Sequence, residues 1–556
     1  MPGPRTRFRA ALRASLLGIT TVAALSVHAG ERPCTSRDPA VAEALGQIRP
    51  DQIRAHMRFL ADDLLEGRGT GARGHQLAAL YVATQFEGLR LEPAGDGGTY
   101  FQSVRLARAQ PREAECSLVL SADGQDRALA YGSDFVMFVD PAGPDAALRA
   151  PIVFAGYGVT APGEHYDDYA GIDVTGKIVA LLEGAPASFG DEPAAFFGDS
   201  VLKRETAARS GAVGILELAL PDDDSIWDQT VAGARHGVMA VAGVGDLAPS
   251  RRIPRLAHLS RNGVAALFGR ESGRLREALA DVKAGKPHSF TTTRELSVRQ
   301  RTERSALDSA NVVGVLRGSD AKLKDEYVVY TAHLDHVGIG EPVDGDAIYN
   351  GARDNASGVA GMLAVARAFA SLARRPRRSI VFVATTAEEP GWLGSRYFVD
   401  QPPVPIHDIV AAINLDGLAV FWPLRDVAGW GARHSSLATA VEEAARQLGL
   451  EATLPDRDSK VLVGFSDQAP FARKGIPAVW LVYGDKSREP GVDPQALERQ
   501  WARTHRPNDD MTQRFDFDSS VKLSQAAFLT GYLVAQDTHR PSWREGDFFG
   551  ARARPW

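Results

Sequence analysis

Residues 327–336 read YVVYTAHLDH, an apolar run of six residues that stops at two histidines and an aspartate. A continuous run of this kind is typical of a strand that is buried on both faces of a sheet. Two other expected strands end in the same way: residues 379–385 precede the pair Glu388-Glu389, and residues 409–414 precede Asp416. Charged side chains are seldom buried unless they are paired or bind a metal. The strand ends therefore mark a candidate site on one rim of one sheet.

The sequence around this stretch alternates apolar strands with helical segments. The alternation predicts an α/β fold, a three-layer α/β/α sandwich with a mixed, largely parallel central sheet. Ligands of such folds gather where the strands end, which is where the polar residues lie. The expected strands are 311–316, 327–331, 379–385, 409–414 and 478–483, and the expected helices include 358–372 and 437–448.

The residue types at the strand ends suit a hydrolase with two metal ions. Imidazole and carboxylate groups are zinc ligands, and a bridging carboxylate lets two ions polarise a carbonyl and activate a water together. A further carboxylate must take the proton of that water and pass it to the leaving amine. The adjacent Glu388 and Glu389 can divide these tasks, because neighbouring residues that leave a strand point in different directions.

Five short motifs occur in a plausible order and spacing, and the set is specific although each motif alone is weak. They are His333-Leu334-Asp335-His336, Asp354-Asn355-Ala356-Ser357-Gly358, Glu388-Glu389-Pro390-Gly391-Trp392-Leu393-Gly394-Ser395, Asn414-Leu415-Asp416 and His505-Arg506-Pro507-Asn508-Asp509. In this order the chain resembles the family of co-catalytic zinc aminopeptidases, which includes aminopeptidase Y, aminopeptidase S and, more distantly, glutamate carboxypeptidase. The resemblance implies a zinc exopeptidase fold and an aminopeptidase that acts on the N-termini of peptides or proteins.

The same resemblance implies two zinc ions per chain, held by five residues. His333 and Asp416 would hold one ion, and Glu389 and His505 the other. Asp354 would bridge the two ions, and in family members the peptide bond that follows this aspartate is cis.

Three further roles come from the resemblance. Glu388 would be the general base and later the general acid, and Asp335 would orient His333. Asp509 would support His505 in a similar way. The family often has a tyrosine immediately before the last histidine, and the residue here is Thr504.

Several alternatives stay open at this stage. A carboxypeptidase or dipeptidase could use the same ligands, and a non-catalytic peptide-binding protein would need none of them. His336, His407 and His434 are interpreted as surface or supporting groups. A serine hydrolase is disfavoured because the sequence has no Gly-x-Ser-x-Gly elbow.

The middle of the chain has short β-like runs and no cluster of acids and bases. Residues 154–158, 166–169, 173–179 and 203–214 resemble a protease-associated domain, which would make the peptidase domain discontinuous. The expected division is 1–29 signal peptide, 39–135 N-terminal part of the peptidase domain, 140–290 protease-associated insert, 300–540 catalytic domain and 541–556 C-terminal tail.

The N-terminus has the features of an export signal. Four arginines precede a short apolar run over residues 14–27, and Ala29 ends a stretch suited to cleavage. An uncleaved anchor is the alternative, although the run is shorter than the roughly 20 residues that span a bilayer. We therefore expect a secreted or periplasmic protein with no stable membrane insertion after cleavage.

Composition narrows the class further. The chain has 556 residues, 44% of them hydrophobic and 24% charged, which is typical of globular proteins with more than one domain. Its net charge of -6 makes nucleic acid an unlikely partner. Cys34 and Cys116 could pair in an oxidising compartment or stay as two thiols. The glycine-rich stretch 66–74 is interpreted as a structural loop, since no Gly-Lys-Ser/Thr closes it.

Overall fold

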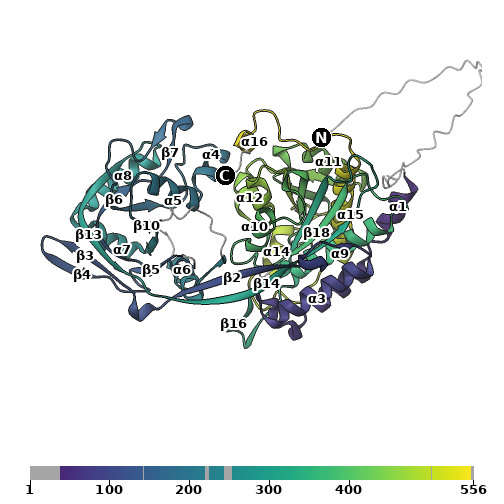
Figure 1. The fold of residues 1–556 in the computed structure, drawn as a ribbon, viewed down its shortest axis with the longest axis horizontal. Helices are drawn as coiled ribbons and strands as arrows, with labels where there is room; N and C mark the ends of the chain where they lie inside the picture. The colour runs from purple at the N-terminus through teal and green to yellow at the C-terminus, as the bar shows by residue number, and fades with distance from the viewer. Residues whose placement is uncertain (1–37, 142, 220–223, 243–252, 502–503, 553–556) are drawn as a thin grey trace, which may run out of the picture.

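The structure is a computed structural model that describes residues 38–141, 143–219, 224–242, 253–501 and 504–552. The expected signal peptide and Cys34 lie outside the described residues. Two lobes are visible in Figure 1, and the long strands β2 (Phe101–Pro111) and β14 (Thr302–Leu316) run from one lobe to the other. No helix in the described ranges is long and apolar enough to cross a membrane.

The first lobe is organised around a ten-stranded mixed sheet. Its four central strands are parallel, but the strands that flank them on the β14 side pair antiparallel. The expected α/β fold is confirmed. The parallel pairing, which was expected for most of the sheet, is confined to its central strands. The order is β11 (Val238–Val241), β2, β14, β18 (Ser379–Thr385), β15 (Tyr327–His333), β19 (Ile409–Asn414), β22 (Ala478–Tyr483), β20 (Asp426–Trp430) and β21 (Glu451–Thr453), with β1 (Glu92–Pro93) beside β14.

Helices cover both faces of this sheet, and every residue of β15, β18 and β19 is buried as a result. The sheet and the helices on its two faces form the three layers. One face packs on α1 (Pro39–Gly46), α2 (Pro50–Leu60), α3 (Arg73–Gly88), α9 (Ser357–Ser371), α11 (Leu437–Gln447) and α15 (Phe517–Gln536). The other face packs on α10 (Leu393–Asp400), α12 (Ser459–Gly464), α13 (Gln468–Arg473) and α16 (Phe548–Arg552).

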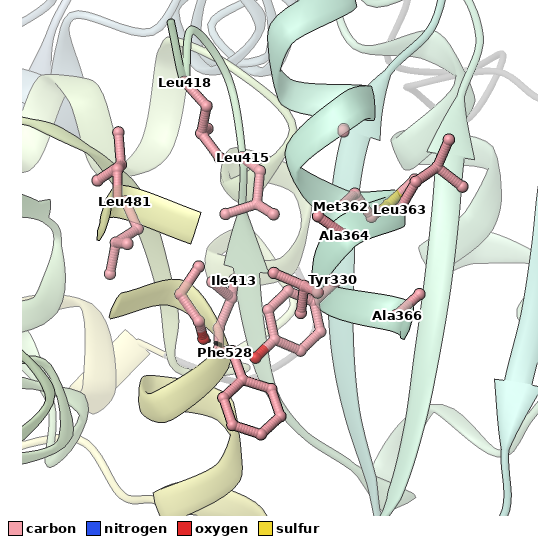
Figure 2. Close-up of a cluster of buried hydrophobic side chains, with 14 of the residues drawn as sticks. Tyr330, Met362, Leu363, Ala364, Ala366, Ile413, Leu415, Leu418, Leu481 and Phe528 are labelled. Carbon is pink, nitrogen blue, oxygen red and sulfur yellow. Dashed lines mark hydrogen bonds between the residues drawn. The ribbon is translucent and has the colours of Figure 1, made fainter. Parts of the chain in front are cut away.

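Figure 2 shows the larger core, where Tyr330 lies among side chains of α9 and α15. Tyr330 stacks on Phe382 with ring centroids 5.4 Å apart, and its hydroxyl donates to the carbonyl of Ala527 at 2.8 Å. The buried hydroxyl is thus satisfied, as an apolar core requires. This packing fixes β15, and with it the strand end that carries His333.

The second lobe contains an eight-stranded sheet built from residues 117–299. Two strand groups differ from the division expected from the sequence. Residues 117–137 belong to this sheet and not to the peptidase lobe, and β11, from inside the expected insert, pairs with β2 of the first sheet. The order is β4 (Gln125–Ala128), β3 (Ser117–Ala122), β13 (Ser289–Arg299), β6 (Ala147–Ala155), β9 (Ile178–Leu182), β10 (Gly214–Leu218), β12 (Arg255–Leu259) and β5 (Phe135–Met137).

Candidate metal centre

The parallel strands of the first sheet bring the predicted site residues to one rim. His333 is the last residue of β15 and lies opposite Thr385, the last residue of β18. The glutamate pair follows β18 by three residues, and Asp416 follows the parallel strand β19 by two. Carboxyl ends of adjacent parallel strands meet at the same edge, which is why these side chains converge.

Two groups of potential ligands share the carboxylate of Asp354. In the first group, His333 Nε2 lies 3.1 Å from Asp354 Oδ1 and 3.3 Å from Asp416 Oδ1. In the second, His505 Nε2 lies 3.3 Å from Asp354 Oδ2 and 2.8 Å from Glu389 Oε2. Tetrahedral zinc with bonds of about 2.0–2.1 Å separates its ligand atoms by roughly 3.3 Å. The residue types and spacings therefore fit one zinc ion in each group.

His336 belongs to this centre, although the sequence reasoning gave it a surface or supporting place. Its ring is buried, and Nδ1 lies 2.7 Å from Glu389 Oε1 and 3.8 Å from Asp354 Oδ2. The short contact fixes one oxygen of Glu389 and leaves the other facing His505. The signal in the sequence was its position, three residues after His333 in the same strand-end loop. His407, by contrast, is exposed.

The main chain around Asp354 is held in a specific conformation. The Asp354–Asn355 peptide bond is cis, as the family resemblance implied. Asp509 accepts hydrogen bonds from the backbone N–H groups of Arg353 and Asp354, both at 3.0 Å. The expectation that Asp509 supports His505 is corrected, because its carboxylate binds these two consecutive N–H groups instead.

The loop after Asp354 is fixed by its own side chains. The Asn355 side-chain oxygen accepts from the N–H groups of Gly358 and Gly417, at 2.8 and 3.0 Å. A Cβ atom at Gly358 would lie 2.2 Å from the carbonyl oxygen of Leu415, so only glycine allows this approach. The motif thus docks the start of α9 against the loop that carries Asp416.

Asp335 acts on a different neighbour from the one expected. His333 Nδ1 faces the backbone carbonyl of Asp335 at 3.1 Å, so the main chain orients this imidazole. The Asp335 carboxylate instead accepts from Thr70 Oγ1 at 2.8 Å and from the backbone N–H of Glu388 at 3.0 Å. Burial raises the pKa of Asp335 to about 6, although His333 opposes the shift. Asp335 therefore positions Glu388.

Glu388 is buried beside the first ligand group. Burial raises the pKa of its carboxyl well above the usual range, and the charges of Asp416 and Asp467 act in the same direction against His333. A carboxyl with a raised pKa can both accept and return a proton near neutral pH. Glu388 thus has the properties of a proton carrier.

The glycine-rich loop places a buried cation, Arg68, next to the main chain of the candidate metal centre. Arg68 is 1% exposed and donates to the carbonyls of Leu334, Asn350 and Gly351 at 2.9, 2.7 and 3.0 Å, and also to that of Leu60. Three of these four carbonyls lie in the segments that carry the potential ligands His333 and Asp354. Nothing in the sequence pattern distinguished this arginine from those on the surface.

A second arginine, Arg353, directly precedes Asp354 in the chain. The Arg353 guanidinium donates to Thr504 Oγ1 at 3.1 Å, to Glu498 Oε1 at 2.7 Å and to the hydroxyl of Tyr483. Family members often have a tyrosine at the position of Thr504. Here Thr504 accepts a hydrogen bond from Arg353, the residue before Asp354. A cavity of about 740 Å³ adjoins this network and is lined in part by Trp422, Trp430, Tyr483, Glu498 and Thr504.

Comparisons with known proteins concern mainly the first lobe. Residues 311–529 match the sequence profile described as Peptidase family M28. Aminopeptidase NAALADL1 of Mus musculus is 33% identical over 138 residues, which are 24% of this chain and 17% of that protein. Aminopeptidase YwaD of Bacillus subtilis (strain 168) is 29% identical over 231 residues, 41% of this chain and 44% of that protein.

A solved structure extends the likeness to both lobes. Aminopeptidase from Aneurinibacillus sp. strain AM-1 superposes with a TM-score of 0.52 at 17% identity, over 90% of this chain and 97% of its own. At this identity the likeness shows a shared fold. The chain spans less than half the length of either curated relative that it matches.

Proposed function

We propose that this protein is a zinc-dependent aminopeptidase that hydrolyses the first peptide bond of peptides or proteins, since residues 311–529 match the profile described as Peptidase family M28. The single observation that carries the proposal is the shared carboxylate of Asp354. It contacts one ligand group through Oδ1 and the other through Oδ2. We accordingly assign two zinc ions per chain, one to His333, Asp354 and Asp416 and one to Asp354, Glu389 and His505.

The mechanism needs a proton carrier close to the scissile bond. Bound zinc would supply Lewis-acid chemistry, which polarises the substrate carbonyl and activates the attacking water. Glu388 takes the proton from that water and later delivers it to the leaving amine. Asp335 keeps Glu388 in place through the backbone hydrogen bond at 3.0 Å.

The charge of the site favours an N-terminal over a C-terminal substrate group. A carboxypeptidase needs a free cation to bind the terminal carboxylate, and two guanidinium groups that the structure describes near the centre, those of Arg353 and Arg68, are engaged. Arg353 is bound by Tyr483, Thr504 and Glu498, and Arg68 by backbone carbonyls. The side chain of the N-terminal residue is assigned to the adjoining cavity.

Two further assignments complete the proposal. The second lobe is taken as a protease-associated domain, supported by the motifs over 154–214, which run from the end of β6 through the start of β9 and α5 (Ser200–Arg209) to the start of β10. Export to the periplasm or the medium rests on the features of residues 1–29. Expression of the full chain, followed by fractionation and N-terminal sequencing, tests the export assignment.

Activity on a substrate panel tests the proposed reaction. The purified chain should cleave free aminoacyl p-nitroanilides and unblocked peptides, and it should lose this activity with a chelator and regain it with zinc. N-acetylated substrates should not be cleaved, and release of C-terminal residues from N-acetylated peptides would instead identify a carboxypeptidase. Metal analysis should find about two zinc ions per chain. A chain that binds no zinc and cleaves nothing would be a binding protein.

A further inference from the structure

Three segments that are distant in the sequence meet on the side of the lobe junction away from β2 and β14. They are α4 (Asp191–Phe197) of the second lobe, the residues that precede α12, and the C-terminal tail with α16 (Figure 1). Their meeting point is a buried cluster of charges around His434. The proposed aminopeptidase reaction uses none of these side chains.

His434 is buried between carboxylates on both of its ring nitrogens. Its Nδ1 lies 2.7 Å from Asp547 Oδ2 in the tail and 3.5 Å from Glu192 Oε1 of α4. Its Nε2 lies 3.1 Å from Asp458 Oδ1, just before α12. A carboxylate at each nitrogen requires both nitrogens to carry a proton, so the ring is an imidazolium. Burial lowers the pKa of His434, but the hydrogen bonds to Asp458 and Asp547 outweigh burial and raise it to about 9.

A second cation belongs to the same cluster. Arg433 Nε lies 2.6 Å from Asp458 Oδ1, and its Nη2 lies 3.6 Å from Asp191 Oδ2 of α4. Asp191 also accepts the backbone N–H of Ser459 at 3.0 Å, and so caps the start of α12 from the other lobe. Glu192, His434 and Asp547 could surround a metal ion, but the proton on His434 Nδ1 already lies between the ring and Asp547, whose Oδ2 is 2.7 Å away. The cluster is therefore an ion-pair network.

Aromatic packing joins the tail to the same point. Phe548 meets Phe196 of α4 edge to face at 5.7 Å, and Arg552 lies 3.5 Å above the Phe548 ring. Phe549 is buried and contacts His434 edge to face at 5.4 Å. The tail is thus packed into the junction, in contact with both lobes.

The helix that begins at this cluster ends beside the metal centre. α12 has six residues, and Phe465 and Ser466 follow it directly. Ser466 Oγ donates to Asp416 Oδ2 at 2.8 Å, and the carbonyl of Phe465 accepts from Trp392 Nε1 at 3.0 Å. This short helix therefore links the His434 cluster to Asp416 through Ser466.

The same helix borders the cleft between the lobes. Asp191 and Ala194 of α4 face Val463 and Trp392 across a space of about 600 Å³. One further ion pair crosses this cleft, from Arg473 to Asp199 at 2.8 Å. Trp392 lies three residues after Glu389, so the cleft reaches the turn that carries the glutamate pair.

We propose that Asp191, Glu192, His434, Asp458 and Asp547 form a clasp that fastens the second lobe across this cleft, with His434 as a positioning residue for Ser466 and Asp416. The clasp keeps the lobes together and holds α12 in place, and the C-terminal tail is one of its three parts. It contains no metal ion and touches no substrate.

The sign of its pH dependence follows from the groups that face His434. Glu192 faces it from α4, Asp458 from just before α12 and Asp547 from the tail. Arg433, which pairs with Asp458 and Asp191, lies beside it. The imidazolium is the group that loses its charge as the pH rises, and the carboxylates stay ionised. The clasp is closed at neutral pH and opens as the pH rises through about 9.

A distance measurement tests the clasp without relying on any activity. Spin labels at Arg127→Cys in the second lobe and Glu489→Cys in the first lobe, in a background without Cys34 and Cys116, report the separation of the lobes by pulsed electron resonance. At pH 7 the distribution should be narrow in the parent protein and in His407→Gln, an exposed histidine of the same lobe. It should be broader or longer in His434→Gln, and in the parent protein at pH 10.

Two further measurements keep the test decisive. Asp547→Asn, or removal of residues 547–556, should open the lobes in the same way if His434→Gln does not fold. Release of zinc to a chelator should be faster in the opened variants, because Asp416 loses its support. An unchanged distance distribution in the folded variants and at pH 10 would overturn the clasp, and bound metal at His434 would replace the ion-pair network with a third metal site.

Discussion

Glu388 and Glu389 are neighbours in the chain, yet their surroundings favour opposite charge states. Burial raises the pKa of Glu388, with Asp416 and Asp467 acting in the same direction. Burial also acts on Glu389, but hydrogen bonds to His336 and His505 outweigh it and lower the pKa of that carboxyl. One glutamate is therefore suited to carry a proton, and the other to stay an anionic ligand.

The division predicts distinct results for the substitution Glu388→Gln. The amide cannot carry the proton, so kcat should fall by about 10²- to 10⁴-fold, the usual contribution of general acid–base catalysis. Zinc content should stay at the parental level, because Glu389 and the other ligands are untouched. Steady-state kinetics and metal analysis measure the two effects, with the exposed Glu489→Gln as the matched control. Full activity in Glu388→Gln would remove Glu388 from the mechanism.

His336 gives a second prediction at the residue scale. Its Nδ1 contact with Glu389 fixes one ligand oxygen, and loss of such a supporting contact typically weakens metal binding by about 10- to 100-fold. His336→Gln should therefore loosen one of two zinc ions and leave the other at its parental affinity. Competition with a chromophoric chelator resolves the two affinities. Loss of both ions, or of neither, would contradict this assignment, and His407→Gln serves as control.

The residues that sequence reasoning placed and those it missed differ in a physical way. His333, Glu389 and Asp416 could be predicted because each ends or follows a strand, and the parallel order brings strand ends together. His336 and Arg68 act through contacts across loops, and no periodicity records such contacts. Their partners come from segments up to 283 residues away.

At the scale of elements, the glycine-rich loop shows what a structural loop can do for a site. Arg68 in this loop is the common donor to carbonyls of three separate segments. Thr70 in the same loop holds Asp335. The stretch 66–74 therefore holds the backbone segments next to the metal centre. Its glycines allow the loop to approach these segments closely, because a Cβ atom at Gly67 would lie 2.4 Å from the carbonyl oxygen of Tyr349.

Replacing the buried cation tests this role. Arg68→Met leaves several buried carbonyls without a donor, and each such group costs about 1–3 kcal/mol. We expect a loss of about 3 kcal/mol or more in the free energy of unfolding, measured by urea denaturation with zinc present. Arg73→Met is the matched control, because this arginine is exposed and its pair with Glu66 is worth about 0–1 kcal/mol. Similar stability of the two variants would show that Arg68 does not support the site.

The central strands of the first sheet could be predicted from the sequence, whereas the pairing of the outer strands could not. Strands β15, β18 and β19 are apolar throughout, and their sequences identify them. β2 and β14 carry polar residues and pair antiparallel along eleven positions, far longer than their apolar parts. The sequence therefore predicted a largely parallel sheet, whereas antiparallel pairing dominates the β14 side.

At the scale of the whole molecule, two sets of contacts link the lobes in addition to the Arg473–Asp199 ion pair. β2 and β14 connect them through main-chain hydrogen bonds, and the clasp connects them through charges and aromatic rings on the other side of the cleft. The domain boundaries could not be predicted because β2 and β14 cross from one lobe to the other. A change in amino-acid composition along the chain can indicate where a different kind of secondary structure begins. It does not indicate which of two sheets a strand will join.

The clasp predicts how the stability of the whole protein depends on pH. The folded pKa of His434, about 9, lies above its ordinary value of 6.5, so its stabilising effect is complete below pH 6.5 and is lost as the pH rises through about 9. The difference corresponds to an effect on the order of 3 kcal/mol at neutral pH or below. His434→Gln should therefore melt below the parent protein at pH 6, and this gap should close progressively towards pH 10.

Thermal unfolding at constant ionic strength and saturating zinc measures the difference in melting temperature between each variant and the parent protein. His407→Gln gives the baseline for an exposed histidine of the first lobe. A gap that stays constant from pH 6 to pH 10 would mean that His434 contributes by packing alone. If the difference in melting temperature between His434→Gln and the parent protein grew with pH, the pH dependence would be opposite to the one expected. The folded protein would then contain a neutral imidazole at His434. Because Asp458 and Asp547 stay ionised throughout this range, only protonation of His434 can make the gap shrink.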